Sequence, residues 1–266
     1  MNSLKFGISG IPLCCRNLLE GIEYLERQGL VNELNFTRRI YIDDKVKKEF
    51  AKRKTAVSAH APYYINLSSA KISVREKSKK LIIDAAKIAE ECNAEKLVLH
   101  LGYYANSFEE SKNLIIENIL EIKEILNRVG NDIKLSPENA GKIGALGSIE
   151  EILEICRILK LEPTIDFAHF YARNIGKKNS KKDFENVLQR IEDIDKKLLK
   201  SLHMHISGIV FGNRGERHHC CLEESKFNWK ACLEALKEFK VGGEVICESP
   251  LLEEDALKMK RYFENI

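Results

Sequence analysis

The chain has 266 residues, and 43 Lys plus Arg against 40 Asp plus Glu give a formal net charge of +3 at pH 7. This charge is too small to indicate a nucleic-acid partner by itself, so any basic surface has to be argued from local residues. No run approaches the roughly 20 apolar residues of a membrane span, and no apolar segment follows a basic start. We therefore expect a soluble cytoplasmic protein with no membrane partner.

Eight short apolar runs recur along the chain and predict β-strands. They lie at residues 4–10, 32–36, 56–62, 96–102, 133–139, 163–169, 202–208 and 244–250. Gly, Pro or Asn stands at or near the end of most of them, which is typical of the turns that follow strands.

The segments between these runs have helical periodicity. In residues 109–126, for example, Ile115, Ile119, Ile122 and Leu126 follow at steps of three and four and form one face, which we interpret as core. Strands that alternate with helices predict an α/β protein, a (β/α)8 TIM barrel with eight parallel strands and outer helices. No Pro-rich or Gly/Ser-rich linker divides the chain, so we expect a single domain over residues 1–266.

The eight cysteines have no C-x-x-C spacing, and a chain of this length does not need disulfides to fold. We expect them to be reduced and to behave as small apolar residues.

Side chains that bind metals gather at the ends of the predicted strands. In a parallel barrel the active site lies at the carboxyl ends of the strands. Imidazole and carboxylate groups together favour zinc, and isolated buried charges are costly unless they are paired or bind a metal. The sequence therefore predicts a metal centre, and its nine candidate ligands are His60, His100, Glu138, Asp166, His169, His205, Glu216, His218 and Glu248.

Two further histidines lie beside these candidates. His203 precedes His205 by two residues and shares its strand face, but deeper in the barrel, so we assign it to packing or to support of a ligand. His219 follows His218, and we interpret it as a similar bystander.

Six segments resemble the endonuclease IV type of apurinic/apyrimidinic endonucleases, within the xylose-isomerase-like barrels. The resemblance runs from the third predicted strand to the eighth. The segments are HAPYYINLSS from His60, LVLHLGYY around His100, PENAGK around Glu138, IDFAH with Asp166 and His169, FGNRGERHH with Glu216 and His218, and ICESP with Glu248.

This resemblance implies a trinuclear zinc site, with manganese in part of the sites. Glu138 would bridge two ions and orient the hydroxide between them. His60 and His100 would complete one of these ions, and Asp166, His205 and Glu248 the other. His169, Glu216 and His218 would hold the third ion.

The activity that the resemblance implies is zinc-dependent DNA repair in base excision. The protein would be a metal-dependent phosphodiesterase that cuts double-stranded DNA on the 5′ side of an abasic site through a metal-bridging hydroxide, leaving a 3′-hydroxyl. The chain departs from the family at Glu216, where the family usually has Asp, and after His205, where Ile206 and Ser207 replace a more polar run.

Basic and aromatic residues in the loops at the same barrel end predict contacts to phosphates and unstacked bases. We expect the protein to bind abasic DNA as a monomer. The candidate DNA-binding residues are Arg38, Arg39, Tyr63, Tyr64, Lys142, Arg173, Arg214 and Arg217.

Two other functions fit part of the pattern. A sugar isomerase or epimerase of the same superfamily needs only Glu138, Asp166, His205 and Glu248 around one divalent ion. The other alternative is a non-catalytic scaffold that a metal stabilises, but such a protein is expected to have lost at least one ligand. The five additional histidines and carboxylates favour the endonuclease.

Overall fold

The computed structural model of the chain describes residues 4–36, 39–53, 55 and 57–266, so the predicted DNA contact Arg38 lies outside the described residues. One sheet of eight strands has the order β5-β4-β3-β2-β1-β10-β7-β6. Its strands are β1 (Leu4–Ser9), β2 (Val31–Asn35), β3 (Val57–His60), β4 (Lys96–Leu99), β5 (Lys134–Pro137), β6 (Thr164–Asp166), β7 (Leu202–Ile206) and β10 (Gly243–Cys247).

Each of these strands overlaps one predicted apolar run. The pairs β1–β10, β10–β7, β7–β6, β3–β4 and β4–β5 are all parallel. Helices separate the strands along the chain, which confirms the predicted (β/α)8 TIM-barrel class.

The α-helices begin at polar caps in most cases. Asn17, Ser107, Ser148 and Ser180 each accept a hydrogen bond from a backbone N–H of the first turn, which satisfies a donor that has no partner inside the helix. The helices are α1 (Leu18–Gln28), α2 (Asp44–Ala51), α3 (Ile72–Glu91), α4 (Phe108–Arg128), α5 (Ile149–Leu159), α6 (Phe167–Arg173), α7 (Lys181–Asp195), α8 (Trp229–Glu238) and α9 (Glu253–Asn265).

Contacts divide the chain into two compact units. The first comprises Met1–Asn32, Asn139–Ile143 and Pro163–Ile266, and the second comprises Glu33–Glu138 and Gly144–Glu162.

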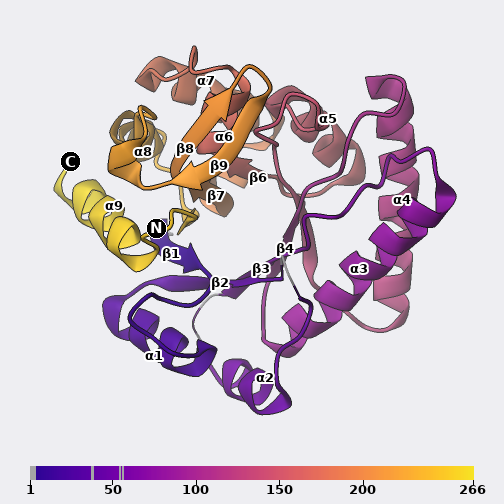
Figure 1. The fold of residues 1–266 in the computed structure, drawn as a ribbon, viewed down its shortest axis with the longest axis horizontal. Helices are drawn as coiled ribbons and strands as arrows, with labels where there is room; N and C mark the ends of the chain where they lie inside the picture. The colour runs from indigo at the N-terminus through magenta and orange to yellow at the C-terminus, as the bar shows by residue number, and fades with distance from the viewer. Residues whose placement is uncertain (1–3, 37–38, 54, 56) are drawn as a thin grey trace. The chain divides into compact units, whose positions relative to one another are not determined.

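The first unit contains an antiparallel hairpin of β8 (Gly208–Gly212) and β9 (Gly215–Cys220), drawn in orange in Figure 1. The hairpin contacts α6. The segment Asn139–Ile143 pairs with β9 and with the turn before it, since the backbone N–H of Glu216 donates to Gly141 O at 3.0 Å and that of Ile143 donates to Arg214 O at 3.1 Å. The hairpin is therefore held by α6 and by this segment.

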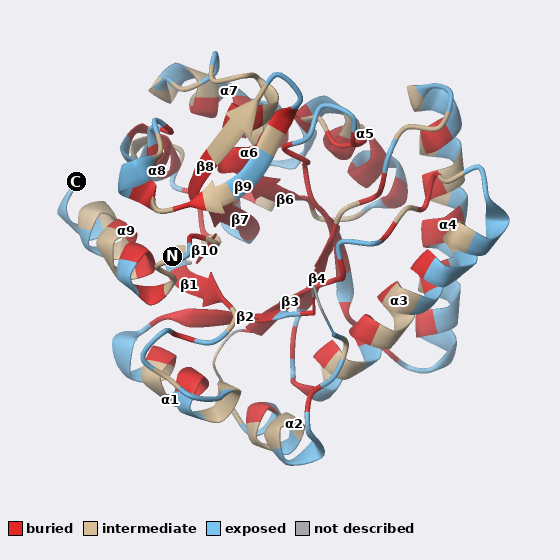
Figure 2. Ribbon diagram, viewed as in Figure 1, coloured by how far each residue is buried: buried red, intermediate tan, exposed pale blue. Residues whose placement is uncertain are grey.

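The second unit packs α3 and α4 against each other. Both helices have buried residues along one side and exposed residues along the other (Figure 2). The predicted stripe of α4 is buried, with Ile115, Ile119 and Ile122 at 0% exposure and Leu126 at 3%. This confirms the helical period as the signal of the core face.

All eight cysteines are free, as expected from their spacing. No helix within the described part of the chain combines the length and the apolar character needed to cross a membrane.

Candidate metal centre

The first group of ligands lies in the second unit and is called the β3–β5 cluster. It consists of His60, the last residue of β3, with His100 and Glu138, which directly follow β4 and β5. Parallel pairing continues past the strand ends, since Glu138 N–H donates to Leu99 O at 3.0 Å. The sheet itself therefore brings the three side chains to one edge.

Glu138 is the centre of this cluster. Its Oε2 lies 3.1 Å from His60 Nε2 and 3.2 Å from His100 Nε2. Ligand atoms about 2.0 to 2.1 Å from one tetrahedral ion lie about 3.3 to 3.4 Å from each other. The distances are close to that spacing, so the donors fit a zinc ion.

The orientation of His60 also fits a ligand. Its Nδ1 lies 2.7 Å from Ala61 O, and because a carbonyl oxygen only accepts, Nδ1 carries the proton and donates. In the neutral ring Nε2 then carries the lone pair, and it faces Glu138. Hydrogen bonds of this kind fix the tautomer of metal-binding histidines.

The second group lies in the first unit and is called the β6–β10 cluster. Asp166 ends β6, His205 is on β7, and Glu248 directly follows β10. Asp166 and His205 occupy paired positions of the sheet. His205 Nδ1 lies 3.4 Å from Glu248 Oε2, and one ligand atom from each of the three residues lies within 4.8 Å of the other two.

The third group, called the hairpin cluster, consists of His169 on α6 with Glu216 and His219 on β9. His169 Nε2 lies 3.4 Å from Glu216 Oε2 and 3.3 Å from His219 Nε2. Asp166 caps α6 by accepting from the backbone N–H of His169 at 2.6 Å, so the second and third groups are joined through Asp166.

The positions of the two adjacent histidines of β9 differ from the sequence interpretation. His218, a predicted ligand, is exposed, whereas His219, interpreted as a bystander, faces His169. The β8–β9 pairing has a register shift in which Val210 pairs with His218 and Phe211 with Glu216, so Arg217 is an extra residue. A bulge of this kind reverses the alternation of the strand, and no local sequence signal marks it.

His203 is 1% exposed and its Nδ1 lies 3.3 Å from Glu244 Oε2 on the paired strand β10. Its ring also packs edge-on against His205, with 5.4 Å between ring centroids. These contacts place it beside a candidate ligand.

The candidate DNA-binding residues differ in their solvent exposure and in their contacts within the protein. Tyr63 and Tyr64 are 51% and 72% exposed, and Tyr63 also lies against His60 and His100. Arg39 lies over the ring of Tyr41 at 4.5 Å. Lys142, Arg214 and Arg217 are exposed.

Arg173 is the exception among them. It is half-buried, and its Nη1 donates to Lys142 O at 2.6 Å. This guanidinium therefore supports the loop that carries Lys142.

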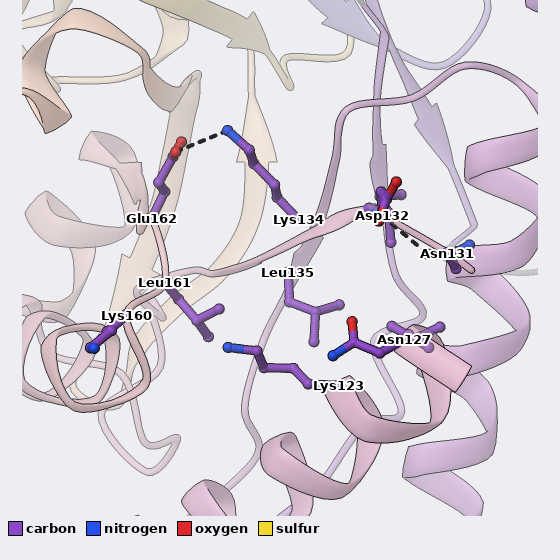
Figure 3. A pocket seen from close by; sticks show the side chains of 11 residues that line it. Lys123, Asn127, Asn131, Asp132, Lys134, Leu135, Lys160, Leu161 and Glu162 are labelled. Carbon is purple, nitrogen blue, oxygen red and sulfur yellow. Dashed lines mark hydrogen bonds and ion pairs between the residues drawn. The ribbon is translucent and has the colours of Figure 1, made fainter. Parts of the chain in front are cut away.

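A pocket of about 280 Å³ opens elsewhere in the second unit (Figure 3). It lies between the start of β5, at Lys134 and Leu135, and the ends of α4 and α5. Glu138 follows the opposite end of β5, and none of the predicted ligands lines this pocket.

The sequence pattern of a protein family described as "Xylose isomerase-like TIM barrel" matches residues 7–266. An uncharacterized protein of Methanocaldococcus jannaschii is 39% identical over 267 residues, which cover 98% of this chain and 97% of that protein. A "Probable endonuclease 4" of Aquifex aeolicus is 29% identical over 187 residues, covering 66% of each chain.

Solved structures with the same fold include both classes of enzyme. Endonuclease IV from Thermus thermophilus superposes with a TM-score of 0.73 at 19% identity, covering 98% of both chains. A D-tagatose 3-epimerase-like protein superposes with a TM-score of 0.70 at 24% identity, covering 98% of this chain and 96% of that one. At these identities the likeness is one of fold.

Proposed function

The chain belongs to the xylose isomerase-like TIM barrel family, and we propose that it is a metal-dependent phosphodiesterase of the endonuclease IV type that cuts DNA 5′ to abasic sites. The observation that carries this proposal is the β3–β5 cluster, in which two imidazole nitrogens lie 3.1 Å and 3.2 Å from one oxygen of the buried Glu138. The "Probable endonuclease 4" relative supports it at the level of sequence.

The donor types of all three clusters suit zinc, with manganese as a substitute. The β3–β5 and β6–β10 clusters would each hold one ion. The hairpin cluster would hold the third. Bound ions of this kind supply the positive charge that activates water and stabilises the oxygens of a phosphodiester under attack.

The chain's own residues have separate tasks in this proposal. His60, whose Nδ1 is held by Ala61 O, keeps Nε2 free of a proton for the ion. Glu138 is 0% exposed and adds negative charge at the same place. The exposed Tyr63 and Tyr64 offer flat surfaces for bases or sugars next to an abasic nucleotide, which is less costly to extrude because it lacks pairing and stacking.

A single-metal sugar isomerase or epimerase is the second candidate, because Asp166, His205 and Glu248 lie together and an epimerase-like structure shares the fold. That chemistry needs no histidine pair at Glu138. His60 and His100 therefore favour the endonuclease.

The test is incubation of the purified protein with a duplex that contains one abasic site. We expect a nick on the 5′ side of the lesion, a product with a 3′-hydroxyl, and loss of the activity with a chelator. The undamaged duplex is the matched control. If the protein fails to nick the lesion but epimerises a ketose, the second candidate replaces the first.

A further inference from the structure

The hairpin cluster contains a histidine that the family resemblance does not use. His218 is the residue that the resemblance assigns to the third ion, yet it is exposed. His219 is partly buried and its Nε2 lies 3.3 Å from His169 Nε2. We propose that His219, rather than His218, is the second imidazole ligand of the ion held by His169, an inference that rests on the metal-binding part of the proposed function.

The first argument is the state of the two rings. His169 Nδ1 lies 3.0 Å from Asn139 O and His219 Nδ1 lies 3.3 Å from Glu248 O. Carbonyl oxygens only accept, so each Nδ1 donates and each neutral ring presents a lone pair at Nε2. Two such lone pairs that face each other repel, and a cation between them removes the repulsion.

The second argument is distance. Nitrogen ligands of a tetrahedral zinc ion lie about 3.3 to 3.4 Å apart, because each Zn–N bond is about 2.0 to 2.1 Å long. The two Nε2 atoms of His169 and His219 are 3.3 Å apart. Two carboxylates are within reach, since Glu216 Oε2 lies 3.4 Å from His169 Nε2 and Asp166 has a ligand atom within 4.8 Å of one from each histidine.

The third argument is the backbone that orients β9. The bulge at Arg217 puts Glu216 and His219, rather than Glu216 and His218, on the side that faces α6. The hydrogen bond from Glu216 N–H to Gly141 O fixes this register from the other edge of the strand. A shift of β9 by one residue would be needed to bring His218 to His169, and it would break that bond.

The test compares His219→Ala with His218→Ala, adjacent substitutions of the same size. Metal-free proteins are loaded with zinc, dialysed, and analysed for zinc per chain, and affinity is measured by competition with a chromogenic chelator. His219→Ala should bind one ion fewer than the wild type, with affinity at that site lowered more than about 100-fold. His218→Ala should keep the wild-type count and its affinities within about twofold.

His219→Cys gives an independent check, because a thiolate also binds zinc. This variant should regain the ion that His219→Ala loses, and cobalt loaded in its place should develop the strong absorption of a sulfur ligand. Circular dichroism shows whether each variant is folded.

Loss of one ion in His218→Ala with full binding in His219→Ala would overturn this inference and leave the proposed function in place. A wild-type protein that binds no zinc at all would overturn both. A cysteine variant that is folded but does not regain the ion would also count against His219 as a ligand.

Discussion

Gly141 lies directly against Glu216, so closely that a Cβ atom at position 141 would be 2.7 Å from both Glu216 Cβ and Glu216 Oε2. The same atom would be 2.9 Å from His169 Cδ2. These distances are shorter than real contacts, so only glycine permits this approach of the carboxylate to the imidazole. The spacing of the hairpin cluster thus depends on a residue that is not itself a candidate metal ligand.

Gly141→Ala should therefore weaken metal binding at the hairpin cluster. The added methyl group has to push Glu216 or the backbone of β9 aside, at a stability cost of about 1 to 3 kcal/mol. Zinc titration should show one weakened site and unchanged binding at the others. Gly144→Ala is the matched control, because nothing lies within 4 Å of a Cβ built there. Equal zinc affinities in both variants would show that the close approach has no role in binding.

Glu138→Gln should abolish cleavage while the protein stays folded. The carboxamide is neutral and has one oxygen, whereas the carboxylate has two oxygens that share a negative charge. The β3–β5 cluster therefore loses the charge that balances a bound ion, and the activation barrier of cleavage should rise by several kcal/mol. Single-turnover cleavage of an abasic duplex measures the effect. Glu109→Gln, on the exposed face of α4, is the control. A Glu138→Gln rate above a tenth of the wild-type rate would remove Glu138 from the proposed mechanism.

The sequence predicts the strands and the ends at which ligands gather, because both follow from short-range pattern. Apolar runs of strand length and the three-to-four spacing of α4 are local properties. That His60, His100 and Glu138 follow three paired strands then puts them at one edge, since parallel strands end together.

The ligands of the hairpin cluster could not be assigned from the local sequence pattern alone. Whether His218 or His219 faces His169 depends on the bulge at Arg217, and the neighbouring Glu216 pairs through its backbone N–H with Gly141 O, more than 70 residues earlier in the chain. The sequence interpretation takes His218 as the ligand from the family resemblance, and strict alternation would also put Glu216 and His218 on one face.

DNA binding should weaken as salt rises, and two arginines should set part of that slope. Arg39 and Arg217 are exposed, and each phosphate contact contributes about 0.9 to the slope of log affinity against log salt. Arg39→Ala and Arg217→Ala should each flatten the slope by about one, measured by fluorescence anisotropy with an abasic duplex. Lys80→Ala, on an exposed turn of α3, should leave it unchanged. Affinity that does not respond to salt would contradict the predicted basic surface.

Alkaline pH should destabilise the fold through its buried thiols. Burial raises the pKa of Cys92 and that of Cys247 to about 12, from an ordinary value of 9.0. The fold favours the neutral thiol, so this stabilisation is fully present below pH 9 and is lost as the pH rises toward 12. Melting temperature should fall above pH 9, and less steeply in Cys92→Ala. Leu120→Ala, at an exposed side chain of α4, should melt with the wild-type pH dependence; equal slopes in all three proteins would contradict this role for burial.

The number of bound ions separates the two candidate functions. Three clusters of ligands predict close to three zinc ions per chain after reconstitution, whereas the single-metal isomerase requires one, and elemental analysis of the dialysed protein distinguishes them. The hairpin ion should leave first under mild chelation. Glu216 is one methylene longer than the family's aspartate, which shifts the ligand geometry of that site away from the family's. A count of one in excess zinc would overturn the trinuclear site and favour the isomerase.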